Sequence, residues 1–256
     1  MPPPPLATEH TPCAVIVGVG DIDGIGGALC RRSVQGGLPT CVVGRTPSKV
    51  QAVVEALRHE GGQAHAIVND LADAAAIERL FLDVEAQGLT PELVVFNAAW
   101  LNLPRRLLQT PAEVFEGNWQ LTGRAGILVA QAGARRMLAR GRGTLLVTGA
   151  TASLRGRPAF AAFASAKAAL RSFTLALAHE LAPRGVHVCH AVIDGLVEGQ
   201  RGKSAVFGLG RLPMWVRGRA GCLQPADVAE AYWAIHQQPP IAWTHELDLR
   251  PAKEPF

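Results

Sequence analysis

The segment 13-CAVIVGVGDIDGIGGAL-29 decides the fold, because an apolar run leads directly into a glycine-rich turn and then into a helical stretch. Glycines at a strand–helix junction let the backbone approach a pyrophosphate, and the helix N-terminus stabilises its negative charge. The position of these glycines on the first such junction favours dinucleotide binding over a bare structural turn. The predicted contacts are Gly20, Gly24, Ile25 and Gly26.

The rest of the chain alternates apolar runs with amphipathic stretches. The runs read as strands at 13–19, 40–45, 64–70, 93–99, 143–150, 185–194 and 245–250, and the stretches as helices at about 25–36, 47–60, 73–87, 111–140, 162–182 and 225–237. Continuous apolar runs suit strands that are covered on both faces. This alternation predicts an α/β fold with one doubly wound parallel sheet of about seven strands and helices on both faces.

Composition restricts the class of protein. A chain of 256 residues that is 48% hydrophobic suits one well-buried domain. The formal charge of +4 is spread without runs of like charge, which argues against nucleic acid. Most of the cations are arginines, which bind phosphate and carboxylate well, so an anionic ligand competes with a solvated arginine-rich surface as their explanation.

The cysteines and the apolar content bear on compartment and metals. Five widely spaced cysteines in mostly apolar runs predict buried thiols, with neither a disulfide framework nor a metal site, and hence a cytoplasmic protein. No apolar stretch approaches the roughly 18 residues of a membrane span, so we expect no membrane association. The prolines in residues 1–11 predict a disordered lead-in.

Several motifs along the chain resemble those of the short-chain dehydrogenase/reductase family. The spacing Gly20-x-x-x-Gly24-x-Gly26 is the glycine motif of that family, 97-NAA-99 resembles its turn after the fourth strand, and 120-QLTG-123 and Lys167 fall at similar intervals. The resemblance covers about residues 13–250. It implies a Rossmann-type catalytic domain at 12–256 with a lid at about 196–224, and a homodimer or homotetramer. It also implies cofactor contacts at Asp70, Leu71, Asn97 and Ala98.

The end of the second predicted strand, 42-VVGRT-46, bears on the choice of cofactor. Gly44 stands where an NAD-preferring protein places an acid, and Arg45, followed by Thr46, suits a 2′-phosphate. This favours NADP(H), with NAD(H) as the second candidate. Asp21 and Asp23 conflict with that preference, because carboxylates beside a phosphate are unfavourable. The alternative is that both aspartates point outward and that Asp23 caps the following helix.

The resemblance implies a catalytic tyrosine four residues before a lysine, a serine thirteen residues before the tyrosine, and an asparagine on the preceding helix. In this chain Lys167 fits the lysine, but Phe163 and Ala150 occupy the tyrosine and serine positions, and Gln120 occupies the asparagine position, two residues after Asn118. The tyrosine of this family transfers a proton, and general acid–base catalysis typically contributes about 10²–10⁴-fold. Ordinary carbonyl reduction should therefore be impaired. The chain's single tyrosine, Tyr232, falls in a segment that the family places away from the nicotinamide.

Other groups could replace the missing acid. Asp194 follows the sixth strand, where it could face the nicotinamide or the substrate, or could serve only as a turn residue. Lys167 itself could act if burial lowered its pKa, although binding the nicotinamide ribose of the cofactor, which the resemblance implies, is its simpler role. The weaker substitutes are Thr148, Thr151, Ser153, Ser165 and His190. The three hydroxyls near residue 150 read first as turn groups, Ser165 as a packing residue that points away from the lysine, and His190 as a core histidine.

Three functions remain open at this stage. The first is an NADP(H)-preferring oxidoreductase acting on a small carbonyl or alcohol substrate with an altered catalytic set. The second is a catalytically inactive dinucleotide-binding sensor or partner protein, and the third is a non-redox enzyme that reuses the pocket. The predicted lid brings in Arg211, Trp215, Arg217 and Arg219, which suit an anionic substrate with an apolar portion or, alternatively, a mobile loop with an aromatic anchor.

Overall fold

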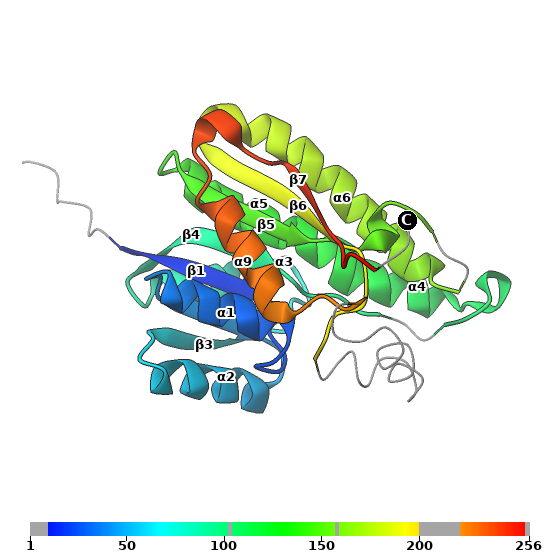
Figure 1. Ribbon diagram of the computed structural model, residues 1–256, viewed down its shortest axis with the longest axis horizontal. Coiled ribbons are helices and arrows are strands. Elements are labelled where there is room, and N and C mark those ends of the chain that lie inside the picture. The colour runs from blue at the N-terminus through cyan, green and yellow to red at the C-terminus, as the bar shows by residue number, and fades with distance from the viewer. Residues whose placement is uncertain (1–9, 102–103, 157–158, 200–220, 254–256) are drawn as a thin grey trace, which may run out of the picture.

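The centre of the protein is one seven-stranded sheet in the order β3-β2-β1-β4-β5-β6-β7, in which all neighbouring strands pair in parallel (Figure 1). The computed structural model describes residues 10–101, 104–156, 159–199 and 221–253. The strands are β1 Thr11–Val17, β2 Thr40–Gly44, β3 Ala64–Val68, β4 Leu89–Phe96, β5 Gly143–Thr148, β6 Val186–Ile193 and β7 Glu246–Leu249. The predicted doubly wound sheet is confirmed.

Helices cover both faces of the sheet. The α-helices are α1 Ile25–Gln35, α2 Pro47–His59, α3 Ala74–Glu85, α4 Ala112–Asn118, α5 Ala125–Leu138, α6 Ala161–Leu181 and α9 Pro225–His236. The apolar sides of α1, α2 and α9 pack on one face, and those of α3, α5 and α6 on the other. The strand β1 is buried along most of its length between these layers. The glycine-rich loop follows at its carboxyl end.

The single helix predicted at 111–140 is interrupted. A π-helical segment, η2 Trp119–Arg124, separates α4 from α5. Two indoles pack against glycines at this junction: a Cβ at Gly117 would lie 1.9 Å from Trp100, and one at Gly123 would lie 2.5 Å from Trp119. Such π segments are frequent at functional sites. The prediction was wrong here because helical periodicity does not register one extra residue in a turn.

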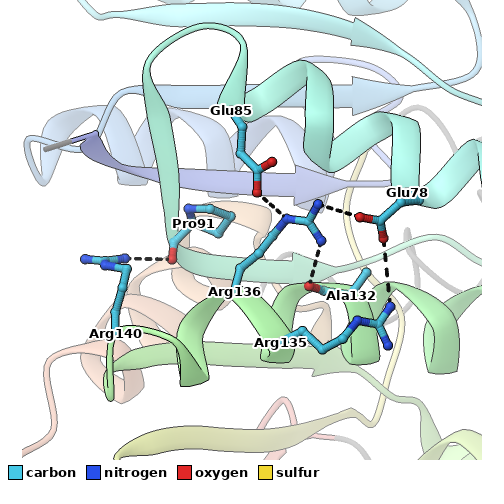
Figure 2. Close-up of polar contacts among 7 residues, drawn as sticks. All are labelled: Glu78, Glu85, Pro91, Ala132, Arg135, Arg136 and Arg140. Carbon is cyan, nitrogen blue, oxygen red and sulfur yellow. Dashed lines mark hydrogen bonds and ion pairs between the residues drawn. The ribbon is translucent and has the colours of Figure 1, made fainter. Parts of the chain in front are cut away.

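Arginines on α5 tie it to α3 (Figure 2). The Arg136 guanidinium donates to Glu85 at 2.6 Å and to Glu78 at 2.7 Å, and it lies over the Phe81 ring at 4.9 Å. Arg140 extends the network by donating to the carbonyl oxygen of Pro91 at 3.1 Å. These arginines therefore have partners within the fold. In this part of the protein, the arginines serve the packing of α5 against α3.

Further features concern the cysteines, the membrane and the lid. All five cysteines are buried free thiols, as expected. In the described part of the chain, no helix has the length and apolar character needed to cross a membrane, and no group of three or more potential metal-ligating side chains occurs.

The predicted lead-in at 1–11 and the lid at 196–224 are described only at residues 10–11, 196–199 and 221–224. The four lid residues Arg211, Trp215, Arg217 and Arg219 lie outside the described residues.

Candidate cofactor and active site

A pocket opens at the carboxyl ends of β1 and β4. It is lined by Gly18, Gly20, Asp21, Asp23, Gly24, Ile25, Gly26, Asn97, Val197, Glu198 and Gly199. The chain turns into it at Gly18, whose φ of +93° lies in the region that favours glycine. The amides of Gly18 and Val19 both donate to the Val43 carbonyl, at 3.0 and 2.9 Å, so β2 holds the loop in place. The predicted glycine-loop residues thus meet in one pocket.

The glycines here allow backbone segments to approach closely. A Cβ at Gly18 would lie 2.4 Å from the amide nitrogen of Ala98, and one at Gly26 would lie 3.0 Å from Val19 Cα. The Asn97 side chain donates to the Gly18 carbonyl at 3.4 Å, which joins the end of β4 to the loop. Gly24 is the N-cap of α1. The result is a cradle of backbone beside a helix N-terminus, which suits a pyrophosphate.

The charge near this cradle is mixed. The carboxylates of Asp21, Asp23 and Glu198 line the pocket. Lys49 Nζ, in the first turn of α2, binds both carboxylate oxygens of Asp21 at 3.0 and 3.1 Å. Asp23 is exposed, and α1 has no side-chain cap at its N-terminus, so the predicted capping by Asp23 is wrong. The backbone bend that puts Gly24 at the cap position leaves Asp23 outside the helix.

The residues after β2 also lie at this edge. Arg45 and Thr46 are exposed, whereas Gly44 is buried. A Cβ at Gly44 would lie 2.5 Å from the carbonyl oxygen of Val19 and 2.9 Å from Val50. The position that could carry a ribose-binding acid is therefore closed to any side chain by the backbone of the glycine-rich loop.

The predicted adenine contacts, Asp70 and Leu71, follow β3. Asp70 is exposed and its carboxylate accepts from the Ala72 amide at 3.1 Å. Leu71 is a non-glycine residue with a φ of +59°, and its side chain packs in the core. Asn69, which sequence reasoning missed, accepts from the Leu71 amide at 2.9 Å and stabilises this strained turn. The side chain of Asp70 is therefore open to solvent, whereas that of Leu71 is buried and leaves only its backbone at the surface of the turn.

Lys167 is a buried lysine whose ammonium lies at the end of β5, at the same edge of the sheet as the pocket. Its side chain is 2% exposed, and Nζ donates to the Thr148 carbonyl at the end of β5, at 2.5 Å. Burial lowers the pKa of Lys167 to about 8. One turn earlier on α6, the Phe163 ring centroid lies 5.8 Å from Nζ. The lysine therefore faces an aromatic ring without a hydroxyl.

The other two predicted catalytic positions differ in exposure. Ala150 is half-buried after β5, and its amide donates to the Ser153 hydroxyl at 3.0 Å. Gln120 is exposed within η2. Asn118 is fully buried, and its side-chain amide donates to the Val114 carbonyl at 2.9 Å. Asn118 is therefore engaged within its own helix, whereas Gln120 is open to solvent.

The hydroxyls near residue 150 are engaged within the protein. Thr148 Oγ1 accepts from the hydroxyl of Tyr232, which is buried, at 3.1 Å, and Thr151 Oγ1 donates to Asp194 at 2.5 Å. The second carboxylate oxygen of Asp194 forms an ion pair with Arg250. Ser165 is exposed, which agrees with its predicted direction but not with a packing role.

His190 is a core histidine. It is 0% exposed, and its Nδ1 lies 3.2 Å from a Glu246 carboxylate oxygen. Burial lowers the pKa of His190 to about 4, because the charged form loses its water. Sequence reasoning missed the partners Glu246 and Arg250, since both come from β7 or just after it and no local pattern links them to residues more than 50 positions earlier.

Comparison with known proteins settles the family. Residues 13–205 match the family model described as short chain dehydrogenase. The chain belongs to the short-chain dehydrogenase family. This confirms the resemblance drawn from the glycine spacing and from the motifs at 97–99 and 120–123.

The relatives of this short-chain dehydrogenase carry oxidoreductase names. It is 34% identical to the short-chain reductase protein NovJ of Streptomyces niveus over 75% of this chain and 71% of that protein. It is 29% identical to 2,3-dihydro-2,3-dihydroxybenzoate dehydrogenase of Bacillus subtilis over 70% of this chain and 68% of that one. The names support an oxidoreductase family.

Two solved structures show the same fold. A short-chain dehydrogenase from Rhodopseudomonas palustris is 32% identical, with a TM-score of 0.77 over 94% of this chain and 99% of that one. An actinorhodin polyketide ketoreductase variant solved with NADPH is 22% identical, with a TM-score of 0.85 over 98% of this chain and 100% of that one. The second likeness concerns the fold alone.

Proposed function

We propose that this short-chain dehydrogenase is an NADP(H)-preferring oxidoreductase for a carbonyl or alcohol group of a small molecule, with Phe163 and Ala150 at the positions of the family's tyrosine and serine. The observation that carries the proposal is the placement of Lys167. It is buried one turn after Phe163 on α6, and it binds the end of β5 at the same edge of the sheet as the glycine-lined pocket.

The described residues fit a dinucleotide. The close approaches at Gly18 and Gly26 leave backbone exposed to a pyrophosphate, and Gly20, Gly24 and Ile25 lie in the same pocket. Asn97 and Ala98 would border the nicotinamide half, Asp70 and Leu71 the adenine, and Arg45 with Thr46 the adenosine ribose. The bound cofactor would supply or accept the hydride.

Lys167 is the best candidate for the proton donor. A pKa of about 8 leaves its ammonium mostly protonated at neutral pH while making it a far better acid than an exposed lysine. Asp194 is a weaker candidate than the sequence indicated, since Thr151 and Arg250 already engage both carboxylate oxygens. The proposed role of Asp194 is therefore to hold the turn after β6.

A catalytically inactive cofactor-binding protein is the second candidate function. The observation that favours it is the internal bonding of the hydroxyls: Tyr232 binds Thr148, and Thr151 binds Asp194. A non-redox enzyme using the same pocket is a third candidate, favoured by no specific contact. We also propose a homodimer or homotetramer, which sedimentation velocity would test.

The deciding experiment has two parts. Titrating NADPH and NADH by nucleotide fluorescence tests cofactor binding, with saturable binding and a lower Kd for NADPH as the expected result. A screen of aldehydes, ketones and imines for NADPH oxidation, and of alcohols for NADP⁺ reduction, tests turnover. Binding without turnover across the panel would replace the oxidoreductase by the inactive binding protein.

A further inference from the structure

An ion pair joins the glycine-rich loop to the start of α2. Lys49 Nζ lies 3.0 and 3.1 Å from the two carboxylate oxygens of Asp21, and the side chains are 48% and 31% exposed, respectively. Asp21 also lines the pocket. The pair is therefore accessible to a ligand that enters the glycine-lined cradle, and one of its two members already lies on the pocket wall.

Arg45 is a further cation near the start of α2. It follows β2 directly, and Lys49 comes four residues later, in the first turn of α2; both are exposed. The carboxylate that would bind an unphosphorylated ribose is absent at Gly44, and the carbonyl of Val19 excludes any side chain there. Two exposed cations and one carboxylate thus lie on the segments that directly follow β1 and β2.

We infer that the Asp21–Lys49 ion pair sets the protein's preference between NADPH and NADH. Lys49 is a second cation for the 2′-phosphate beside Arg45, and Asp21 competes with that phosphate for Lys49. The inference rests on the proposed cofactor binding and adds the residues that control its selectivity.

The competition follows from charge. A phosphate monoester carries about −1.5 to −2 charges at neutral pH. It therefore attracts the Lys49 ammonium more strongly than a single carboxylate does at the same distance. Asp21 weakens this attraction in two ways: it holds Lys49 in its own ion pair and it repels the phosphate. NADH lacks the phosphate, so its binding leaves the pair intact.

Binding measurements on four proteins test the inference. The dissociation constants of NADPH and NADH are measured by fluorescence at one fixed ionic strength for the wild type, Lys49→Ala, Asp21→Asn and the double variant. For Lys49→Ala we expect NADPH binding to weaken about tenfold, and for Asp21→Asn we expect it to tighten about fivefold, as removal of one charge a few ångströms away predicts. The NADH constants should change less than about twofold, because that cofactor lacks the phosphate.

The double variant separates competition from simple repulsion. If Asp21 acts through Lys49, the gain from Asp21→Asn shrinks to less than about half when Lys49 is already alanine. Lys49→Arg should retain the NADPH preference. Arg31→Ala is the matched control, because Arg31 forms a similar exposed pair with Glu60 at 2.8 Å near the other end of α2.

Four results would overturn the inference. Equal loss of NADPH and NADH affinity in Lys49→Ala would make Lys49 a structural residue, and a full gain from Asp21→Asn in the Lys49→Ala background would make Asp21 act on the phosphate directly. If the folded wild type binds neither cofactor, the proposed function fails together with the inference. If the wild type binds NADPH and Lys49→Ala binds it equally well, the inference alone fails.

Discussion

The glycine-lined side and the lysine side of the candidate site are held in place by different kinds of contact. Around Gly18 and Gly26, the geometry depends on the backbone and on the absence of side chains. Around Lys167 and Asp194, it depends on side chains whose partners come from distant segments. The comparison teaches that the geometry of the glycine-lined side does not depend on the side chains around Lys167, because the two sides share few residues.

The largest expected effect concerns the lysine side of the site, where proton transfer is proposed. Replacing Phe163 by Tyr together with Ala150 by Ser would supply the hydroxyls that the family uses, next to Lys167. We expect NADPH-dependent reduction of some carbonyl in the screened panel to rise about 100-fold or more, as positioned acid catalysis provides. Steady-state kinetics would measure it. No gain on any substrate would contradict the assignment of these two positions.

The glycine-lined side should be disrupted by the addition of a single methyl group. Gly18→Ala places a Cβ 2.4 Å from the Ala98 amide at a φ of +93°. We expect a loss of about 4 kcal/mol in the free energy of unfolding, combining overpacking with left-handed strain. Chemical denaturation measures this loss. Gly61→Ala is the control, because its φ is +85° with nothing within 4 Å, so only about 1 kcal/mol of strain is expected.

Acid should lower the free energy of unfolding through protonation of His190. Its pKa falls from the ordinary 6.5 to about 4 in the folded protein, so the unfolded chain binds more protons between these values. Stability is therefore lost as pH falls from about 6.5 toward 4, by about 3 kcal/mol in all. The lowered pKa of Glu246, held by Arg171, adds a further loss at lower pH.

Comparing unfolding free energies at pH 7 and pH 4.5 for the wild type and His190→Gln would test this. The variant should show a smaller loss on acidification. His59→Gln, at an exposed position on α2, should leave the loss unchanged. An equal pH dependence in His190→Gln would show that other groups account for it.

The smallest effect concerns Asp194. Replacing it by Asn removes one of the charged partners of Arg250, whose side chain is 15% exposed, and leaves the Thr151 contact uncharged. Asp248 remains, 3.6 Å from the same guanidinium. We expect about 2 kcal/mol of destabilisation, less than the loss of one partner costs in a fully buried pair, because Arg250 keeps some solvent contact and its ion pair with Asp248. Thermal unfolding measures it. A loss of turnover with unchanged melting temperature would instead return Asp194 to a catalytic role.

Much of the fold followed from local patterns. The apolar runs predicted all seven strands, although β4 begins at Leu89, four residues earlier than expected, and includes Pro91 beside a register shift in β1. The helix predicted at 111–140 failed at η2, where Trp100 and Trp119 pack on glycines. Packing partners of this kind are set by the folded chain, so periodicity in one segment does not reveal them.

The amino-acid sequence by itself determined the parallel sheet, the glycine-rich turn after the first strand and the phenylalanine one helical turn before Lys167, because spacing and residue type report directly on backbone geometry and available chemistry. The tertiary structure alone decided which polar side chains are already engaged. The contacts of Thr151 with Asp194, His190 with Glu246, and Tyr232 with Thr148 join residues 43, 56 and 84 positions apart. Only folding brings such groups within hydrogen-bonding distance.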